Sequence, residues 1–247
     1  MYENKQSQSG VPGAQPGDCE ACDRRVFDRV GAITAEEQTA LLRIAHNKRL
    51  AAGQTYVIEG DRARDFASVT KGVAKMVRCA EDGRSQIVGL LFPKDFVGGP
   101  ILFEASAREL YSIEAVTELH LCLFSRAGFR KVLLEHPALE HRLLNQALDE
   151  LQLAREWMVL LGRKTAAERV ASFLLYVGEK MQAQPGDCAT GFDLPVSRAD
   201  IADFVGLTVE TVSRQITKLR KAQIIVMDGP KHVVSLDMAR LRLLTGF

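Results

Sequence analysis

The hydrophobic pattern of the chain changes period near His136 and Pro137, and this change divides the molecule. Before it, short runs rich in β-branched and aromatic residues alternate with turn signals such as Gly53 and Gly60. The runs are TYVIEG, ASVTKGVAKMVRC, SQIVGLLF, LYSIEAV and LHLCLF. Short strands that recur roughly every 8–12 residues predict an all-β barrel or roll.

After Pro137, apolar residues recur three and four positions apart, with no Pro or Gly before Gly162. They are Leu144, Ala147, Leu151, Ala154, Met158 and Leu161. This spacing predicts one long helix with a heptad seam. The seam either packs on the β-roll or pairs with a second copy of the chain, and heptad spacing favours the second copy. We therefore expect a homodimer.

The carboxyl-terminal third has the pattern of a winged helix-turn-helix. Residues 165–182 carry an apolar helical stripe, and a polar loop follows. Ser197 is a good N-cap for the next helix, Gly206 suits a tight turn, and Thr208 caps a second helix. The runs IIVM and HVVSL, joined by D-G-P-K, predict the hairpin that forms the wing.

The expected fold class is therefore α+β: a cyclic-nucleotide-binding-like β-roll, a long dimerisation helix and a winged helix-turn-helix. Thr34, in T-A-E-E, predicts the start of a short helix whose apolar positions run through Leu41 to Ala45. The expected divisions are residues 1–31 (tail and possible sensor loop), 32–136 (β-roll effector domain), 137–163 (dimerisation helix) and 164–247 (DNA-binding domain).

The second helix of the turn motif carries the residues expected to read DNA. Its predicted inward positions are Val209, Val212, Ile216 and Leu219, which leaves Glu210, Thr211, Ser213 and Arg214 outward. Arg214 suits guanine and Glu210 suits cytosine in a major groove. Lys218, Arg220 and Lys221 suit backbone phosphates. Glu210 and Arg214 alone would fit a surface ion pair, but the caps, turn and wing together favour double-stranded DNA as partner.

The β-roll, long helix and winged helix-turn-helix, in this order, resemble the Crp/Fnr transcription regulators over roughly residues 30–245. G-L-T-V-E-T-V-S-R at residues 206–214 resembles the recognition segment of the Fnr/FixK branch. The resemblance implies that Glu210, Ser213 and Arg214 read a TTGAT-like half-site, which a homodimer meets twice in an inverted repeat. It also implies that Arg198 and Thr208 lie near phosphates, and that RNA polymerase is a partner.

Cyclic nucleotide is not expected as the effector. In nucleotide-binding members of the family an Arg-Ser pair holds the phosphate, and the matching positions here are Glu109 and Leu110. A carboxylate at that place repels phosphate. F-V-G-G-P at residues 96–100 offers no glutamate for the ribose.

The stretch D-C-E-A-C-D at residues 18–23 raises the possibility of a metal site, although two cysteines supply only half of a four-cysteine site. The resemblance to Fnr implies a [4Fe–4S] cluster held by Cys-x2-Cys-x5-Cys (or x7) and one cysteine of the β-roll. Cys19, Cys22 and Cys122 match that pattern. The third position holds Asp28 at x5 and Val30 at x7, so Asp28 is the candidate fourth ligand.

Two other readings stay open. One is a cluster-free FixK-like regulator, controlled by its expression level or by thiol oxidation, with Cys188 as the thiol to examine. The other, more remote, is a CxxC thiol redox enzyme, but no βαβ unit surrounds the motif. The five histidines are dispersed and form no recognisable catalytic motif. A non-enzymatic regulator is therefore expected.

Net charge and hydropathy limit how the chain can bind DNA and where it is expected to act. The net charge is +1, so a DNA-binding surface must be a local patch. The chain has no apolar run of about 18 residues, which argues against a membrane partner. Its polar start lacks a secretory signal, and the expected location is the cytoplasm.

Overall fold

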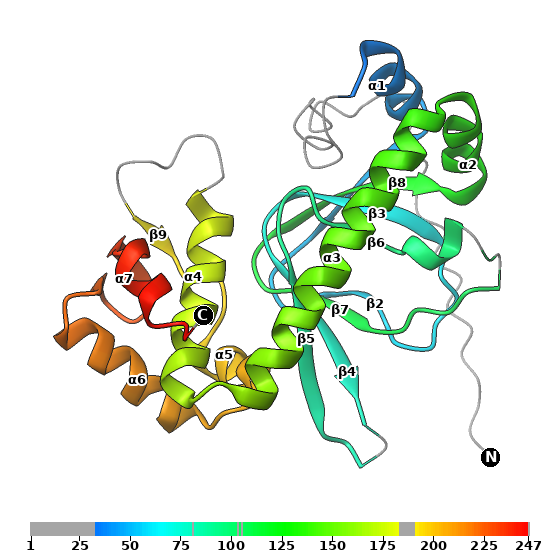
Figure 1. Cartoon of the computed structure of the whole chain (residues 1–247). Helices are drawn as coiled ribbons and strands as arrows, with labels where there is room; N and C mark the ends of the chain where they lie inside the picture. The colour runs from blue at the N-terminus through cyan, green and yellow to red at the C-terminus, as the bar shows by residue number, and fades with distance from the viewer. Residues whose placement is uncertain (1–32, 81, 103, 105, 183–190, 247) are drawn as a thin grey trace, which may run out of the picture.

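The computed structural model describes residues 33–80, 82–102, 104, 106–182 and 191–246. Figure 1 shows a β-roll, a group of helices with a small sheet, and one long helix that runs diagonally between them. Among the described residues, no helix combines the length and apolar character needed to span a bilayer. This architecture confirms the expected fold class.

The β-roll consists of two antiparallel four-stranded sheets. The first has the order β1 (Ala45–Leu50), β8 (Leu119–Ser125), β3 (Asp65–Lys71) and β6 (Phe96–Val97). The second has the order β2 (Thr55–Val57), β7 (Ser112–Ala115), β4 (Ala74–Cys79) and β5 (Ser85–Leu91). Alternate residues point inward, as Ile113 and Ala115 do on β7, and fill the space between the sheets.

Two short helices and a 3₁₀ turn cover one end of the roll. They are α1 (Ala35–Leu42), η2 (Gly99–Leu102) and α2 (Arg126–Glu135). Thr34 caps α1 in a capping box with Glu37, as expected. However, the helix ends at Leu42, and Ala45 begins β1, because Ala45 and Leu50 face the roll while the residues between them are exposed. The sequence pattern predicted neither β1 nor α2.

The long helix α3 (Pro137–Arg163) contains 27 residues and is therefore about 40 Å long. Pro137 occupies the first turn, where a missing backbone N–H costs nothing. Lys164 ends the helix in an extended conformation. One end of α3 thus lies beside the roll, and its other end leads into the carboxyl-terminal domain (Figure 1).

The carboxyl-terminal domain is a winged helix-turn-helix. Its helices are α4 (Ala166–Gln182), α5 (Arg198–Val205), α6 (Val209–Lys221) and α7 (Met238–Leu243). Its sheet has the order β10 (Ile225–Asp228), β11 (His232–Leu236) and β9 (Phe192–Asp193). Buried residues of this domain continue into those of β4 and β5, so one apolar core joins the roll to the winged domain.

Candidate nucleic-acid interface

The turn between α5 and α6 is fixed by local hydrogen bonds. The Asp200 N–H donates to Ser197 Oγ at 3.1 Å, and the Ser197 N–H donates to Asp200 Oδ2 at 3.0 Å. Gly206 ends α5 with φ 64° and ψ 47°, a left-handed conformation that suits glycine. Thr208 then caps α6 by accepting from the Thr211 N–H at 3.3 Å. The two helices are therefore held at a defined angle.

The inner face of α6 consists of Val212, Ile216 and Leu219, which are buried. The expectation that Val209 also points inward is wrong, because its side chain is 40% exposed. Val209 is the first residue of the helix, and the buried inner face begins only with the next turn. The helix consequently packs through its later turns and projects its first turn from the domain.

The residues expected to read bases lie on this projecting end. Glu210, Ser213 and Arg214 are all exposed. Arg214 donates to Thr211 Oγ1 at 3.3 Å, and the described structure records no ion pair between Arg214 and Glu210. Hydrogen bonds from its own backbone N–H and from the Thr208 hydroxyl lower the pKa of Glu210, which is therefore ionised at neutral pH. These side chains are placed to exchange hydrogen bonds with an external partner.

Cationic groups flank the reading end. Lys218, Arg220 and Lys221 are exposed on the last turns of α6. Arg198 is half-buried and donates to the wing, through Nη2 to the Pro230 carbonyl at 3.1 Å. Burial and the nearby Arg220 charge lower the pKa of Arg198, and its Nη1 has no hydrogen-bond partner within the described structure. Two neighbouring guanidinium groups favour an anion such as a DNA phosphate.

The heptad residues of α3 form an apolar stripe on its surface. Leu144, Leu151 and Met158 are 57%, 46% and 72% exposed. Ala147 and Ala154 are exposed, and Leu161 is half-buried. Leu148 and Val159, which lie outside the predicted heptad seam, are also exposed and widen the stripe. Large exposed apolar side chains in one row are typical of an interaction surface.

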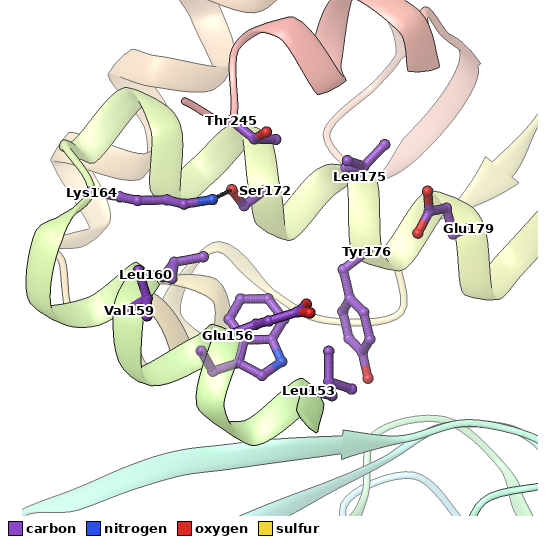
Figure 2. Close-up of a pocket in the computed structure, with 11 residues that line it drawn as sticks. Leu153, Glu156, Val159, Leu160, Lys164, Ser172, Leu175, Tyr176, Glu179 and Thr245 are labelled. Atoms are coloured by element: carbon purple, nitrogen blue, oxygen red, sulfur yellow. Dashed lines mark hydrogen bonds between the residues drawn. The ribbon is translucent and has the colours of Figure 1, made fainter. Parts of the chain in front are cut away.

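The other side of α3 ties this helix to the winged domain. Trp157 packs edge-on against Tyr176 of α4, with ring centroids 5.2 Å apart, and against Phe204 of α5, at 4.7 Å. A cavity of about 540 Å³ opens beside Trp157 and Tyr176. Figure 2 shows Lys164 donating to Ser172 on its wall. Aromatic contacts therefore join α3 to both α4 and α5.

Of the expected sensor residues, the structure describes only Cys122. It lies on β8, is fully buried and belongs to an apolar cluster with Leu41 of α1 and Phe129 of α2. Cys122 is disulfide-bonded, whereas Cys79, the other cysteine in the described part of the chain, is exposed and free. Cys19, Cys22, Asp28 and Cys188 lie outside the described residues.

A buried hydroxyl lies opposite Cys122. Ser68 on β3 is in register with Cys122 on β8, so the two side chains share one face of the sheet. Ser68 is fully buried, and its Oγ has no hydrogen-bond partner among the described residues. Ile33, where the described chain begins, packs against the cluster that contains Cys122. The Ser68 hydroxyl, a possible hydrogen-bond donor, and the first described residue, Ile33, therefore both lie near the Cys122 side chain.

Glu109 and Leu110 are the residues that the resemblance aligns with the phosphate-binding pair of nucleotide-binding members. Glu109 is half-buried, and both burial and the nearby Asp61 carboxylate raise its pKa. Leu110 is 52% exposed. A carboxylate and an apolar side chain at these positions offer no donor to a phosphate.

A β-roll followed by a long helix and a winged helix-turn-helix with an exposed, polar reading end defines a DNA-binding transcription regulator rather than an enzyme. The chain matches the Cyclic nucleotide-binding domain over residues 47–136 and the Crp-like helix-turn-helix domain over residues 168–244. It belongs to the Crp/Fnr family of transcription regulators.

Three similar proteins place the chain within this family. It is 41% identical to the transcriptional activator protein FnrL of Cereibacter sphaeroides, over 91% of this chain and 89% of that protein. It is 37% identical to the nitrogen fixation regulation protein FixK of Bradyrhizobium diazoefficiens, over 92% and 93%. The solved structure of FixK2 from Bradyrhizobium japonicum superposes with a TM-score of 0.71 at 30% identity, covering 81% of this chain and 97% of that one.

Proposed function

We propose that this regulator binds, as a homodimer, a TTGAT-like inverted repeat, with Glu210, Ser213 and Arg214 reading each half-site. The exposure of these three side chains on the capped first turns of α6 carries the proposal. Arg214 can donate two hydrogen bonds to guanine, and the ionised Glu210 accepts from cytosine. Thr208, Arg198 and Lys218 contact the phosphates on either side.

Dimerisation through α3 is proposed from the exposed stripe that includes Leu144, Leu151 and Met158. Pairing two copies removes these side chains from water, at roughly 25 cal/mol per Å² of apolar surface. A two-fold dimer presents two α6 helices to successive major grooves, which explains the need for an inverted repeat. We further propose that the dimer activates transcription in the cytoplasm by contacting RNA polymerase, because the similar proteins are named as activators.

We propose that oxygen controls this activity through a [4Fe–4S] cluster that Cys19, Cys22, Cys122 and Asp28 hold once the disulfide at Cys122 is reduced. The surroundings of Cys122 fit such a group: the sulfur is shielded from water by apolar side chains, and the orphaned Ser68 hydroxyl can donate to a sulfur ligand. Such a cluster would link the amino-terminal segment to the roll through oxygen-labile bonds. Losing it would weaken the dimer and therefore DNA binding.

A second mode of control is favoured by one observation, the disulfide at Cys122. In this mode the regulator has no cluster, and its thiols respond directly. Closing a disulfide removes two electrons and two protons from two thiols, and dioxygen or a peroxide accepts them. Cys188 is a further thiol that could respond in this mode. A cluster-free regulator could also be controlled by its expression level alone, with no response of its thiols.

Neither mode uses cyclic nucleotide. Glu109 and Leu110 occupy the phosphate-binding positions and provide no cationic donor. Adding cyclic AMP is therefore expected to leave DNA binding unchanged.

Anaerobic purification followed by iron and sulfide analysis and a visible spectrum tests the sensor. The proposal expects iron, sulfide and a broad absorbance that air bleaches together with DNA binding. A colourless, iron-free protein that binds its DNA equally well in air and under reducing conditions contradicts both the cluster and the thiol response, and leaves control by expression level alone. An iron-free protein that loses DNA binding on oxidation and regains it with dithiothreitol identifies the thiol mode.

A further inference from the structure

A second cavity, of about 520 Å³, lies between the β-roll and the first half of α3. Phe66 and Phe96 line it, and their rings stack with centroids 4.9 Å apart and 26° between planes. Leu102 of η2 and Leu133 of α2 add apolar surface. Neither Glu109 nor Leu110 lines this cavity, but Gly99 does, and so do Leu144 and Ala147 of the proposed dimer seam. Its size and apolar walls are typical of a small-molecule site.

One polar side chain in the wall has no partner. Gln146 of α3 lines the cavity and is 7% exposed, and its Nε2 and Oε1 form no hydrogen bond within the described structure. An unsatisfied buried amide destabilises a folded protein, and a leucine of similar size would remove that cost. The terminal torsion of glutamine is soft, so the amide can turn toward a ligand with little strain.

Charged and titratable side chains of α3 also line the cavity. They are Glu140 and Glu150, both exposed, and His141. Two carboxylates disfavour an anionic ligand, whereas the aromatic pair favours a flat aromatic one. We propose that this cavity binds a small, neutral aromatic molecule that carries a carboxamide or lactam group. Its amide pairs with Gln146, because each amide can both donate through an N–H and accept through its carbonyl oxygen.

The position of Gln146 gives the ligand a route to the rest of the molecule. Arg142 lies one turn earlier on α3 and donates to Glu37 of α1 at 2.6 Å. The Glu37 side chain is 3% exposed and that of Arg142 is 23% exposed, so the ion pair is largely shielded from water. A ligand bound between the roll and α3 therefore influences the position of α3 close to the ion pair of Arg142 with Glu37, which holds α1. Phe66, Leu102 and Leu133 share one apolar cluster with Cys122, so this route passes close to that cysteine, but it does not require an iron–sulfur cluster.

Fluorescence titration of the full chain with 2-naphthamide, and with naphthalene as the matched compound without an amide, tests the proposal. We expect the wild type to bind 2-naphthamide about tenfold more tightly than naphthalene, because the amide gains hydrogen bonds. Gln146→Leu should bring the two affinities within about twofold of each other. Gln152→Leu, an exposed glutamine of the same helix, should keep the tenfold preference. 2-Naphthoate should bind more weakly than either neutral compound.

Other outcomes overturn the proposal. Absence of binding, or an amide preference that Gln146→Leu leaves intact, excludes the amide pairing. Binding only to the dimer-breaking variant Leu151→Asp means that the second copy fills the cavity. Thermal unfolding supplies a control for folding, since Gln146→Leu should unfold at or above the wild-type temperature without ligand. Gln146→Met replaces it if the leucine variant does not fold.

Discussion

Lys75 Nζ on β4 lies 3.1 Å from Asp200 Oδ1 on α5, which joins the β-roll to the first helix of the DNA-binding motif. The side chains are only 24% and 20% exposed. Lys75 also contacts Glu114 of β7 at 3.2 Å. The contact is reinforced by Asp203, which accepts from the Ile87 N–H of β5 at 3.1 Å. The recognition domain is therefore docked on the same hairpin that closes the roll.

Replacing Lys75 by methionine should loosen this docking. It leaves two partly buried carboxylates unpaired, and we expect a loss of about 1–3 kcal/mol in the free energy of unfolding, measured by urea denaturation. Lys71→Met is the matched control. Lys71 lies 3.8 Å from Glu118 with both side chains more than half exposed, so its replacement should change stability by less than about 0.5 kcal/mol. Equal effects of the two substitutions would contradict the docking role.

Acid should remove the contribution of this contact. Burial raises the pKa of Asp200, but the hydrogen bonds from Ser197 and the Lys75 charge outweigh it, and the pKa lies below its ordinary value of 3.8. A carboxylate with a lowered folded-state pKa stabilises the protein above the ordinary value, and the effect is lost as pH falls through the folded value. The stability difference between wild type and Lys75→Met should be constant near neutrality and shrink below pH 3.8. A difference that grows on acidification would contradict this.

The proposed cluster makes Asp28 a sensitive position. A carboxylate oxygen is a poorer ligand for iron in a sulfide cluster than a thiolate. Asp28→Ala should shorten the lifetime of the visible absorbance in air, and Asp28→Cys should lengthen it. Asp23→Ala, a neighbouring carboxylate outside the ligand pattern, is the control. Identical decay in all four proteins would remove Asp28 from the ligand set.

A charged residue introduced into the exposed apolar stripe of α3 should disrupt the proposed dimer. Leu151→Asp places a carboxylate in the proposed dimer seam, so light scattering should report a monomer and affinity for the inverted repeat should fall. Leu134→Asp is the matched control, because Leu134 is 79% exposed on α2, away from the seam. A Leu151→Asp protein that stays dimeric would place the dimer interface elsewhere.

Local patterns predicted most of what is local. Thr34, Ser197 and Thr208 cap helices as expected, because capping depends on residues three positions away. The pattern missed β1, since AHNKRL carries its two buried residues at its ends and polar residues between them. The hydrophobic pattern also predicted that Val209 points inward. A helical period shows which residues share a face, but it does not show how far along the helix that face is covered by the rest of the domain.

Long-range relationships lay beyond the sequence. Lys75 and Asp200 are 125 residues apart, and neither carries a motif that names the other. Gln146 looked like an ordinary polar residue of a surface helix, and only the fold shows that it is buried without a partner. The register of Ser68 with Cys122 likewise depends on strand pairing that a single sequence does not specify.

The base-reading role of Arg214 is the central claim, and one titration tests it most directly. Affinities of wild type, Arg214→Ala and Lys218→Ala are measured by fluorescence anisotropy for the inverted repeat and for repeats changed at one base pair of each half-site. Arg214→Ala should lose about 1–3 kcal/mol on the intact repeat and stop discriminating at one base pair, whereas Lys218→Ala should weaken binding to every sequence alike. If Arg214→Ala weakens all sequences by the same factor, α6 does not read bases through Arg214.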